Sequence, residues 1–353
     1  MSSNYGPTVA RTHGRPGRET RPKTLTVDVH NHVWSLEAEA FVKPHFDPSK
    51  VSMTRGAPDA TKELMKRQAA DRRPHQTDWK VRIAEMDKMG IDVQVISVVP
   101  SQMYPQLPLD VVVKSSSIVN DSLAELAANK PDRFVAIGTV PLPDGKAAAA
   151  ELERCVTKLG FKGVQVPTNF GGKELSDPAH EPFWAKAEEL GAVVFVHPSG
   201  FTHPERLSRF YLNNTIGNPL ETTIAVHYLI LDGVLERYKT LKVVAAHGGA
   251  FAAAYSGRMD HAWGARSDAH GDLPNPPTSY LRRIYFDSLV FTPHQLEYLV
   301  RTFGADRIML GTDFPADMGE YEPLGHLASV DSFDAATREA VAGGNARRLF
   351  NIG

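Results

Sequence analysis

The sequence predicts an α/β protein, a (β/α)8 TIM barrel with insertions over the C-terminal mouth, and three observations support this fold class. Eight short apolar runs recur along the 353 residues, with amphipathic stretches between them. The runs are apolar throughout rather than alternating, as is typical of parallel strands covered by helices. Four of the runs end in His or Asp, as expected where the ends of barrel strands converge on one mouth.

The predicted strands are residues 26–33, 93–99, 134–140, 163–167, 193–197, 242–246, 284–286 and 307–310. The helical patterns between and after them are 80–89, 116–129, 146–159, 181–190, 220–236, 295–303 and 335–350. In the first of these helices, Val81, Ile83, Met86 and Met89 form one apolar face. Strands that alternate with helices in this way indicate parallel βα units.

The main alternative to the barrel is an open doubly wound sheet. A doubly wound sheet is expected to have a glycine-rich phosphate turn after its first strand, whereas the first strand here ends with His30, Asn31 and His32. Two segments interrupt the alternation of strands and helices. Residues 34–78 are long, mixed and charged, and are predicted to be an insertion over the barrel mouth. Residues 266–279 are rich in Asp, Gly, His and Pro and are predicted to be a loop.

Composition excludes several classes of partner. Lys and Arg number 39 against 41 Asp and Glu, so a nucleic-acid partner or a basic membrane-binding patch is not expected. No apolar stretch approaches 18 residues, which argues against a membrane span. Cys155 is the only cysteine, so no internal disulfide or thiolate cluster is possible, and a reducing, cytoplasmic location is expected.

The chain is expected to divide into two parts. Residues 1–23 are rich in Arg, Gly, Ser, Thr and Pro and lack an apolar core, which predicts a flexible N-terminal arm rather than a secretory signal. A transit peptide is the alternative interpretation of this arginine-rich start. Residues 24–353 are expected to form a single barrel domain.

Three histidines and one aspartate are the candidate metal ligands. His30 and His32 are two residues apart on the first strand, so their side chains lie on the same face, which is the interior of a closed barrel. His197 ends the fifth strand, and Asp313 follows the eighth strand. Three imidazoles and a carboxylate suit zinc or a similar divalent ion. The alternatives are a core role for His197 and a helix N-cap role for Asp313.

A proton carrier is expected beside this metal. His247 ends the sixth strand, is followed by two glycines, and would titrate near neutral pH. It is predicted to be a general acid/base, with a fifth metal ligand as the alternative. The fourth strand ends in Gln165, Val166 and Pro167 without a lysine that could bridge two ions, so one metal ion is predicted, with zinc preferred and manganese the alternative.

These residues resemble the amidohydrolase superfamily, and within it the decarboxylase branch typified by 2-amino-3-carboxymuconate-6-semialdehyde decarboxylase and aromatic acid decarboxylases. The resemblance runs from about residue 26 to the C-terminus. It is carried by WKVRIAEMD at 79–87, VVP at 98–100, AHGGAF at 246–251 with GR at 257–258, and LGTDFP at 310–315 with GE at 319–320.

The resemblance implies a role for each candidate residue. His30, His32, His197 and Asp313 would bind the metal, and His247 would be the general acid/base. Arg258 would contact the substrate carboxylate, in some family members across a dimer interface, so a homodimer is expected. The chain departs from the family pattern at Ser199 and Gly200, where a Trp-Asp pair is expected, and at Arg72 and Arg73, where the expected arginine is not aligned.

The expected activity is therefore that of a carbon-carbon lyase without an organic cofactor. The metal would polarise the substrate or a water molecule, and His247 or Asp313 would transfer the proton during decarboxylation of a small conjugated or aromatic carboxylic acid. The main alternative is a hydrolase or hydratase acting on an ester, lactone, amide or C–C bond. A non-catalytic binding protein on a degenerate barrel would have lost some of the candidate ligands, and all five strand-end residues are present.

Overall fold

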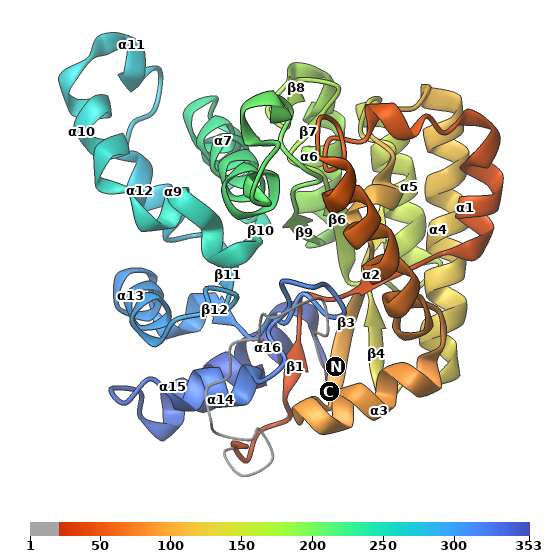
Figure 1. Cartoon of the computed structure of the whole chain (residues 1–353). Helices are drawn as coiled ribbons and strands as arrows, with labels where there is room; N and C mark the ends of the chain where they lie inside the picture. The colour runs from red at the N-terminus through yellow and green to blue at the C-terminus, as the bar shows by residue number, and fades with distance from the viewer. Residues whose placement is uncertain (1–20) are drawn as a thin grey trace.

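A ring of parallel strands occupies the centre of the computed structural model, which describes residues 21–353 (Figure 1). Each of the eight predicted strands has a counterpart in the ring. The strands are β1 (Val27–Asp28), β2 (His32–Val33), β3 (Val93–Val98), β4 (Phe134–Ala136), β5 (Gly138–Thr139), β6 (Gly163–Val166), β9 (Val193–Val196), β10 (Lys242–Ala245), β11 (Tyr285–Asp287) and β12 (Ile308–Met309). Two strand positions are interrupted, because β1 and β2 share the first position and β4 and β5 share the third.

Backbone hydrogen bonds close the ring. β3 pairs with β1, β2 and β4, and the order from β5 onward is β5, β6, β9, β10, β11 and β12. The first and last strand positions meet where the N–H of Val29 donates to the carbonyl of Leu310 at 2.9 Å. A parallel bridge between Asn31 and Phe314 extends this contact. The closure brings the first and last strand positions together and sets the first-strand histidines beside the segment after β12.

Helices surround the strands, as α3, α4, α5, α6 and α7 show in Figure 1. The α-helices are α1 (Leu36–Val42), α2 (Asp59–Thr77), α3 (Trp79–Met89), α4 (Leu109–Asn129), α5 (Gly145–Thr157), α6 (Glu181–Leu190), α7 (Asn218–Leu231), α8 (Val234–Arg237), α9 (Ala250–Ala254), α10 (Gly257–Ala265), α11 (Ser267–His270), α12 (Pro277–Leu281), α13 (Pro293–Phe303), α14 (Pro323–Ala328), α15 (Ala335–Glu339) and α16 (Asn345–Phe350).

Short turns of other helix types and one hairpin complete the fold. The 3-10 turns are η1 (Lys43–His45), η2 (Pro48–Lys50), η3 (Pro100–Met103), η4 (Pro178–His180), η5 (Pro204–Leu207), η7 (His247–Gly249) and η8 (Ala305–Arg307). The π-helical turns are η6 (Asn213–Gly217) and η9 (Ala340–Gly344). The antiparallel hairpin is β7 (Asn169–Phe170) and β8 (Lys173–Glu174).

The predicted elements differ from the structure in several places, and the helix predicted at 116–129 begins earlier, as α4 (Leu109–Asn129). The pattern at 220–236 is two helices, α7 and α8, because the chain turns at Gly233 with φ of +73°. The pattern at 335–350 is interrupted by the π-helical turn η9. The predicted loop 266–279 is wrong in part, since it contains α11 and the start of α12, which has Pro277 at its first turn. The predicted arm, residues 1–23, lies almost entirely outside the described residues.

The core has two layers. Side chains inside the ring form one cluster, which includes Val27, Val95, Phe195, Val244 and Met309. A larger cluster fills the space between the strands and the helices. None of the helices in residues 21–353 is long and apolar enough to cross a membrane.

Candidate active site and metal centre

Four side chains from distant parts of the chain meet at one end of the ring. Ligand atoms of His30, His32, His197 and Asp313 all lie within 4.8 Å of one another, and all four residues are buried. The Nε2 atoms of His32 and His30 lie 3.1 and 3.5 Å from one carboxylate oxygen of Asp313. The structure therefore brings together all four predicted metal ligands.

The hydrogen bonds of the three imidazoles determine which nitrogen faces the site. His30 Nδ1 lies 2.6 Å from the carboxylate of Asp287. The Nδ1 atoms of His32 and His197 lie 3.2 and 2.7 Å from backbone carbonyl oxygens. Each Nδ1 therefore carries the proton, which leaves the lone pair on Nε2. All three Nε2 atoms are buried without a hydrogen-bond partner, as expected for ligands of a divalent metal ion.

Asp287 is a further candidate site residue, which the sequence analysis does not single out. It ends β11 and, besides contacting His30, accepts hydrogen bonds from the backbone N–H groups of His247 at 2.9 Å and Gly248 at 2.7 Å. One carboxylate thus orients a candidate metal ligand and the turn that carries His247. The available signal was its position, because an Asp that directly follows an apolar run belongs to the same strand-end pattern as the other candidates.

His247 lies beside the four-residue cluster. Its ring centroid is 5.2 Å from those of His30 and His197, and its Nδ1 is buried without a partner. The backbone of His247 is left-handed, with φ of +58°, and the turn continues through Gly248. A Cβ atom on Gly248 would stand 2.4 Å from the side chain of Val290, so this turn requires glycine.

Burial and neighbouring charges shift the titration of the cluster. Burial alone would raise the pKa of Asp313, but His30 and His32 hold that pKa at about 2. Burial would likewise lower the pKa of His30, yet its hydrogen bond with Asp287 and the charge of Asp313 raise the pKa above its ordinary value. Burial, reinforced by His30, lowers the pKa of His247 to about 4. The expectation that His247 titrates near neutral pH is therefore wrong for this fold: burial keeps the imidazole neutral at pH 7, with one N–H and one lone pair.

Two adjoining pockets open onto the cluster and share Asp313. The first, of about 520 Å³, contains the candidate ligands His32 and His197 and is lined by three cationic side chains. These cations come from the inserted segment 34–78, which confirms that this segment lies at the barrel mouth. They are Lys50, Arg55 and Arg72. A pocket with this lining favours an anionic ligand.

The second pocket, of about 330 Å³, extends past His247 and is mainly apolar. Its apolar lining includes Phe251, Val290, Phe291 and Leu299. Both pockets are mainly apolar, and only the first carries the three cations. This combination suits an organic acid with a hydrophobic body.

Arg258 does not line either pocket within this chain. It is exposed at the start of α10, which projects at the upper left of Figure 1. Arg72 on α2 does line the first pocket, where its guanidinium lies 3.0 Å from a carboxylate oxygen of Asp317. The substrate-binding role of Arg258 stays a prediction, because the structure contains one copy of the chain.

A barrel with three imidazoles and a carboxylate at its C-terminal mouth defines a class of metal-binding barrel proteins. The sequence profile of the amidohydrolase family matches residues 27–352, and the chain belongs to this family. A 2-amino-3-carboxymuconate-6-semialdehyde decarboxylase from Dictyostelium discoideum is 35% identical over 280 residues, which cover 78% of this chain and 77% of that protein.

Solved structures show the same fold. The 5-carboxyvanillate decarboxylase from Sphingomonas paucimobilis is 23% identical, with a TM-score of 0.83 over 94% of this chain and 100% of that chain. The 5-carboxyvanillate decarboxylase from Novosphingobium aromaticivorans, complexed with manganese and 4-hydroxy-3-methoxy-5-nitrobenzoic acid, is 22% identical. Its TM-score is 0.82 over 97% of this chain and 100% of that chain.

Proposed function

We propose that this protein is a metal-dependent, non-oxidative decarboxylase of an aromatic or conjugated carboxylic acid. The observation that carries the proposal is the buried cluster of His30, His32, His197 and Asp313, whose three Nε2 atoms have no hydrogen-bond partner. The cluster opens into a pocket lined by cations. The decarboxylase names of the relatives point to the same reaction.

Each residue has a proposed part in the reaction. A bound divalent ion would polarise a substrate oxygen or lower the pKa of a bound water molecule. Arg72 and the other pocket cations bind the anionic groups of the substrate, and the apolar pocket beyond His247 takes its hydrophobic body. The bond to the carboxyl carbon breaks and carbon dioxide leaves. His247 or Asp313 would transfer a proton, taken from a water molecule or a hydroxyl group of the substrate, to the substrate carbon that loses the carboxylate.

The proposed metal is a single zinc ion, with manganese as the alternative. Imidazole nitrogens and carboxylate oxygens are both ligands that zinc takes in proteins. The manganese in the Novosphingobium enzyme is the reason for keeping the second metal. Elemental analysis of the purified protein, followed by removal of the metal and reconstitution with each ion, distinguishes the two.

The test of the reaction is release of carbon dioxide by the metal-loaded protein. We propose 5-carboxyvanillate and 2-amino-3-carboxymuconate-6-semialdehyde as the first acids to assay, because these acids are named for the relatives. His247→Ala is expected to abolish release while retaining the metal. His227→Ala, on the half-buried face of α7, is the matched control and is expected to keep activity. A product heavier by one water molecule would instead identify a hydratase or hydrolase.

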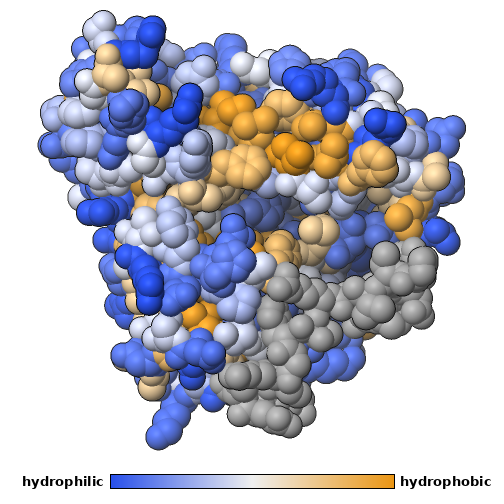
Figure 2. All heavy atoms as spheres, turned by 60° about the vertical axis from the view of Figure 1, so that its left-hand side comes forward, coloured by the Kyte–Doolittle hydropathy of each residue, from blue (hydrophilic) through white to orange (hydrophobic). Residues whose placement is uncertain are grey.

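We also propose that the protein is a cytoplasmic homodimer in which Arg258 reaches the pocket of the partner subunit. Phe251 and Tyr255, which precede Arg258, are 41% and 70% exposed. The side of the molecule that carries α9 and α10 in Figure 1 is turned forward in Figure 2, which shows a band of apolar side chains beside a hollow. The cytoplasmic location is supported by the single, buried thiol of Cys155.

Mixing of two inactive variants tests this arrangement. If Arg258 acts across the interface, a mixture of His247→Ala and Arg258→Ala subunits forms hybrid dimers with one intact site, and activity returns. No recovery from subunits that are shown to exchange would place Arg258 and His247 of one site on the same chain. Light scattering of the eluted protein gives the oligomeric state independently.

A further inference from the structure

We propose that Arg82 and Asp28, a buried pair of opposite charges bridged by Gln94, position the metal ligands of both the first and the last barrel strand. All three residues are buried, with side chains that are 0 to 1% exposed. The proposal rests on the metal site proposed above. It gives a role to Arg82 and Asp28, which take no part in the proposed reaction steps.

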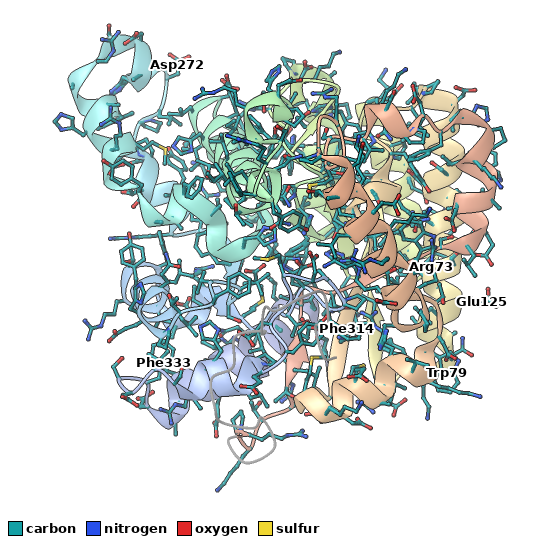
Figure 3. The ribbon with its side chains drawn as sticks, viewed as in Figure 1. Arg73, Trp79, Glu125, Asp272, Phe314 and Phe333 are labelled. Carbon is teal, nitrogen blue, oxygen red and sulfur yellow. The ribbon has the colours of Figure 1, made fainter. Side chains whose placement is uncertain are left out.

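Arg82 holds the segment that carries the two first-strand histidines. Its guanidinium donates to the backbone carbonyl of His32 at 2.8 Å and to the side-chain oxygen of Asn31 at 2.5 Å. Asn31 lies between the two candidate ligands. The guanidinium carbon also lies 5.1 Å from the ring centroid of Phe314, the residue after Asp313. Phe314, labelled in Figure 3, lies near the middle of the molecule, where the first and last strand positions meet.

Asp28 binds the same two segments, the one that carries His30 and His32 and the one that carries Asp313. Its carboxylate accepts a hydrogen bond from the backbone N–H of His30 at 3.1 Å. It also accepts from the N–H of Thr312 at 3.1 Å and from its hydroxyl at 2.7 Å. His30 and Thr312 are, respectively, a candidate ligand and the residue before Asp313. One carboxylate therefore connects the backbones that place two of the four ligands.

Gln94 on β3 joins the two charges. Its side-chain oxygen accepts a hydrogen bond from Arg82 Nε at 2.7 Å, and its Nε2 donates to Asp28 at 2.9 Å. The two contacts define one orientation of the amide, because only the oxygen can accept from Arg82 and only the nitrogen can donate to Asp28. A fully connected polar network of this kind restricts both attached segments to one arrangement.

The charges around the site support the same conclusion. Asp28, Asp287 and Asp313 are buried carboxylates, and the buried guanidinium of Arg82 is joined to Asp28 through Gln94. Buried charges are costly unless they are balanced. When His30 is neutral, as a metal ligand must be, three carboxylates and one guanidinium leave two uncompensated negative charges, which a divalent cation between His30 and Asp313 would neutralise. Arg82 and Asp28 are therefore matched to the ligand site in charge as well as in position.

The test measures metal affinity, which a purely structural role would not change selectively. Gln94→Met removes both bridging hydrogen bonds at nearly constant volume, and Arg82→Lys keeps the charge but loses the planar fork of donors. Both variants are expected to bind Zn²⁺ and Mn²⁺ about 10- to 100-fold more weakly in competition with a chelator. The absorption bands of the Co²⁺-substituted variants are expected to shift as the ligand geometry changes.

Arg283→Met is the matched control. Arg283 also donates to backbone carbonyl oxygens, those of Leu235, Tyr238 and Lys239, but has no contact with the ligand segments. This variant is expected to melt at a lower temperature with an unchanged metal dissociation constant. If Gln94→Met and Arg82→Lys behave like Arg283→Met, the proposal is wrong. If one of them does not fold, the nearly isosteric Asp28→Asn replaces it, with the same expected loss of affinity.

Failure of this inference is distinguishable from failure of the proposed function. A wild-type protein that binds no divalent metal would contradict the metal site itself. A wild-type protein that binds metal, with Gln94→Met and Arg82→Lys of equal affinity, would contradict only the positioning role of Arg82 and Asp28.

Discussion

The hydrogen bond between His30 and Asp287 determines which nitrogen of a candidate metal ligand is available. At 2.6 Å this bond keeps the proton on Nδ1 and leaves Nε2 free to bind a metal ion. The same carboxylate supports the turn of His247. Loss of its charge should therefore affect both the metal and the proton carrier.

The first prediction concerns Asp287→Asn. An amide in this place is a weaker acceptor and can present its NH₂ group to His30, which would favour the wrong tautomer. Metal affinity is expected to fall about 10- to 100-fold, as is typical for loss of a hydrogen-bond partner of a metal-bound histidine. Chelator competition measures this loss.

Asp260→Asn is the control for that measurement. Asp260 also accepts hydrogen bonds from a backbone N–H and a hydroxyl, both of Thr278, but it lies on α10 and has no contact with the cluster. Metal affinity should be unchanged in this variant. Equal affinities for wild type and Asp287→Asn would show that Asp287 does not orient His30.

At the scale of elements, the inserted segment before α2 is attached to the segment between β9 and α7. Gly200 adopts φ of +85°, and a Cβ atom there would stand 2.9 Å from Ser52 Cβ and 3.0 Å from the backbone nitrogen of Met53. Asn213 also donates to the carbonyl of Ser52 at 2.6 Å. Gly200 is one of the two positions where the resemblance implied a Trp-Asp pair, and a side chain there would collide with residues 52 and 53.

The second prediction is that Gly200→Ala weakens substrate binding. The added methyl group would push residues 52 and 53, which line the cationic pocket, away from the site. KM is expected to rise by on the order of tenfold, equal to about 1.4 kcal/mol of binding free energy, with kcat nearly unchanged. Steady-state kinetics with the acid that the protein decarboxylates give both KM and kcat.

Gly160→Ala separates this effect from backbone strain. Gly160 also has a positive φ, of +71°, but a Cβ atom there would have no neighbour within 4 Å. Both substitutions should therefore cost about 1 kcal/mol of stability through the left-handed backbone, while KM rises only in Gly200→Ala. A similar KM in the two variants would show that the inserted segment does not contribute to substrate binding.

At the scale of the whole molecule, a metal ion would join parts of the chain that lie far apart in sequence. His30 and Asp313 are at opposite ends of the barrel sequence, and the ring closes where they meet. Binding to the folded state alone stabilises it by about 4 kcal/mol when free metal is 1,000 times its dissociation constant. The stability of the protein should therefore depend on its metal content.

The third prediction follows from this dependence and concerns pH. Metal removal is expected to lower Tm, and the difference in Tm between metal-bound and metal-free protein should narrow as the pH falls from 8 to 6. The pKa of His30 is raised in the metal-free fold, so protonation of His30 stabilises that fold at low pH. This stabilisation is lost as the pH rises through the raised pKa. Protons also compete with the metal for the same nitrogen.

Thermal unfolding with and without a chelator, at several pH values, measures the difference. A gap that widens on acidification would contradict the raised pKa of His30. Recovery of the original Tm after metal is added back is the control for irreversible damage by the chelator.

The sequence by itself determined the barrel, its eight strands and the five strand-end residues. Apolar runs and strand periodicity are local properties, and parallel strands in a barrel all direct their C-terminal ends to one mouth. The sequence alone therefore predicts that His30, His32, His197, His247 and Asp313 meet at one mouth, and the structure places them there.

Only the tertiary structure decided what holds these residues in place. His30 contacts Asp287 across 257 positions of sequence, and Asp28 contacts Thr312 across 284. No local periodicity encodes such pairs, because each depends on the register at which strands meet and on how the ring closes. The same reason explains why the contact of Gly200 with the insertion appears only in the folded chain.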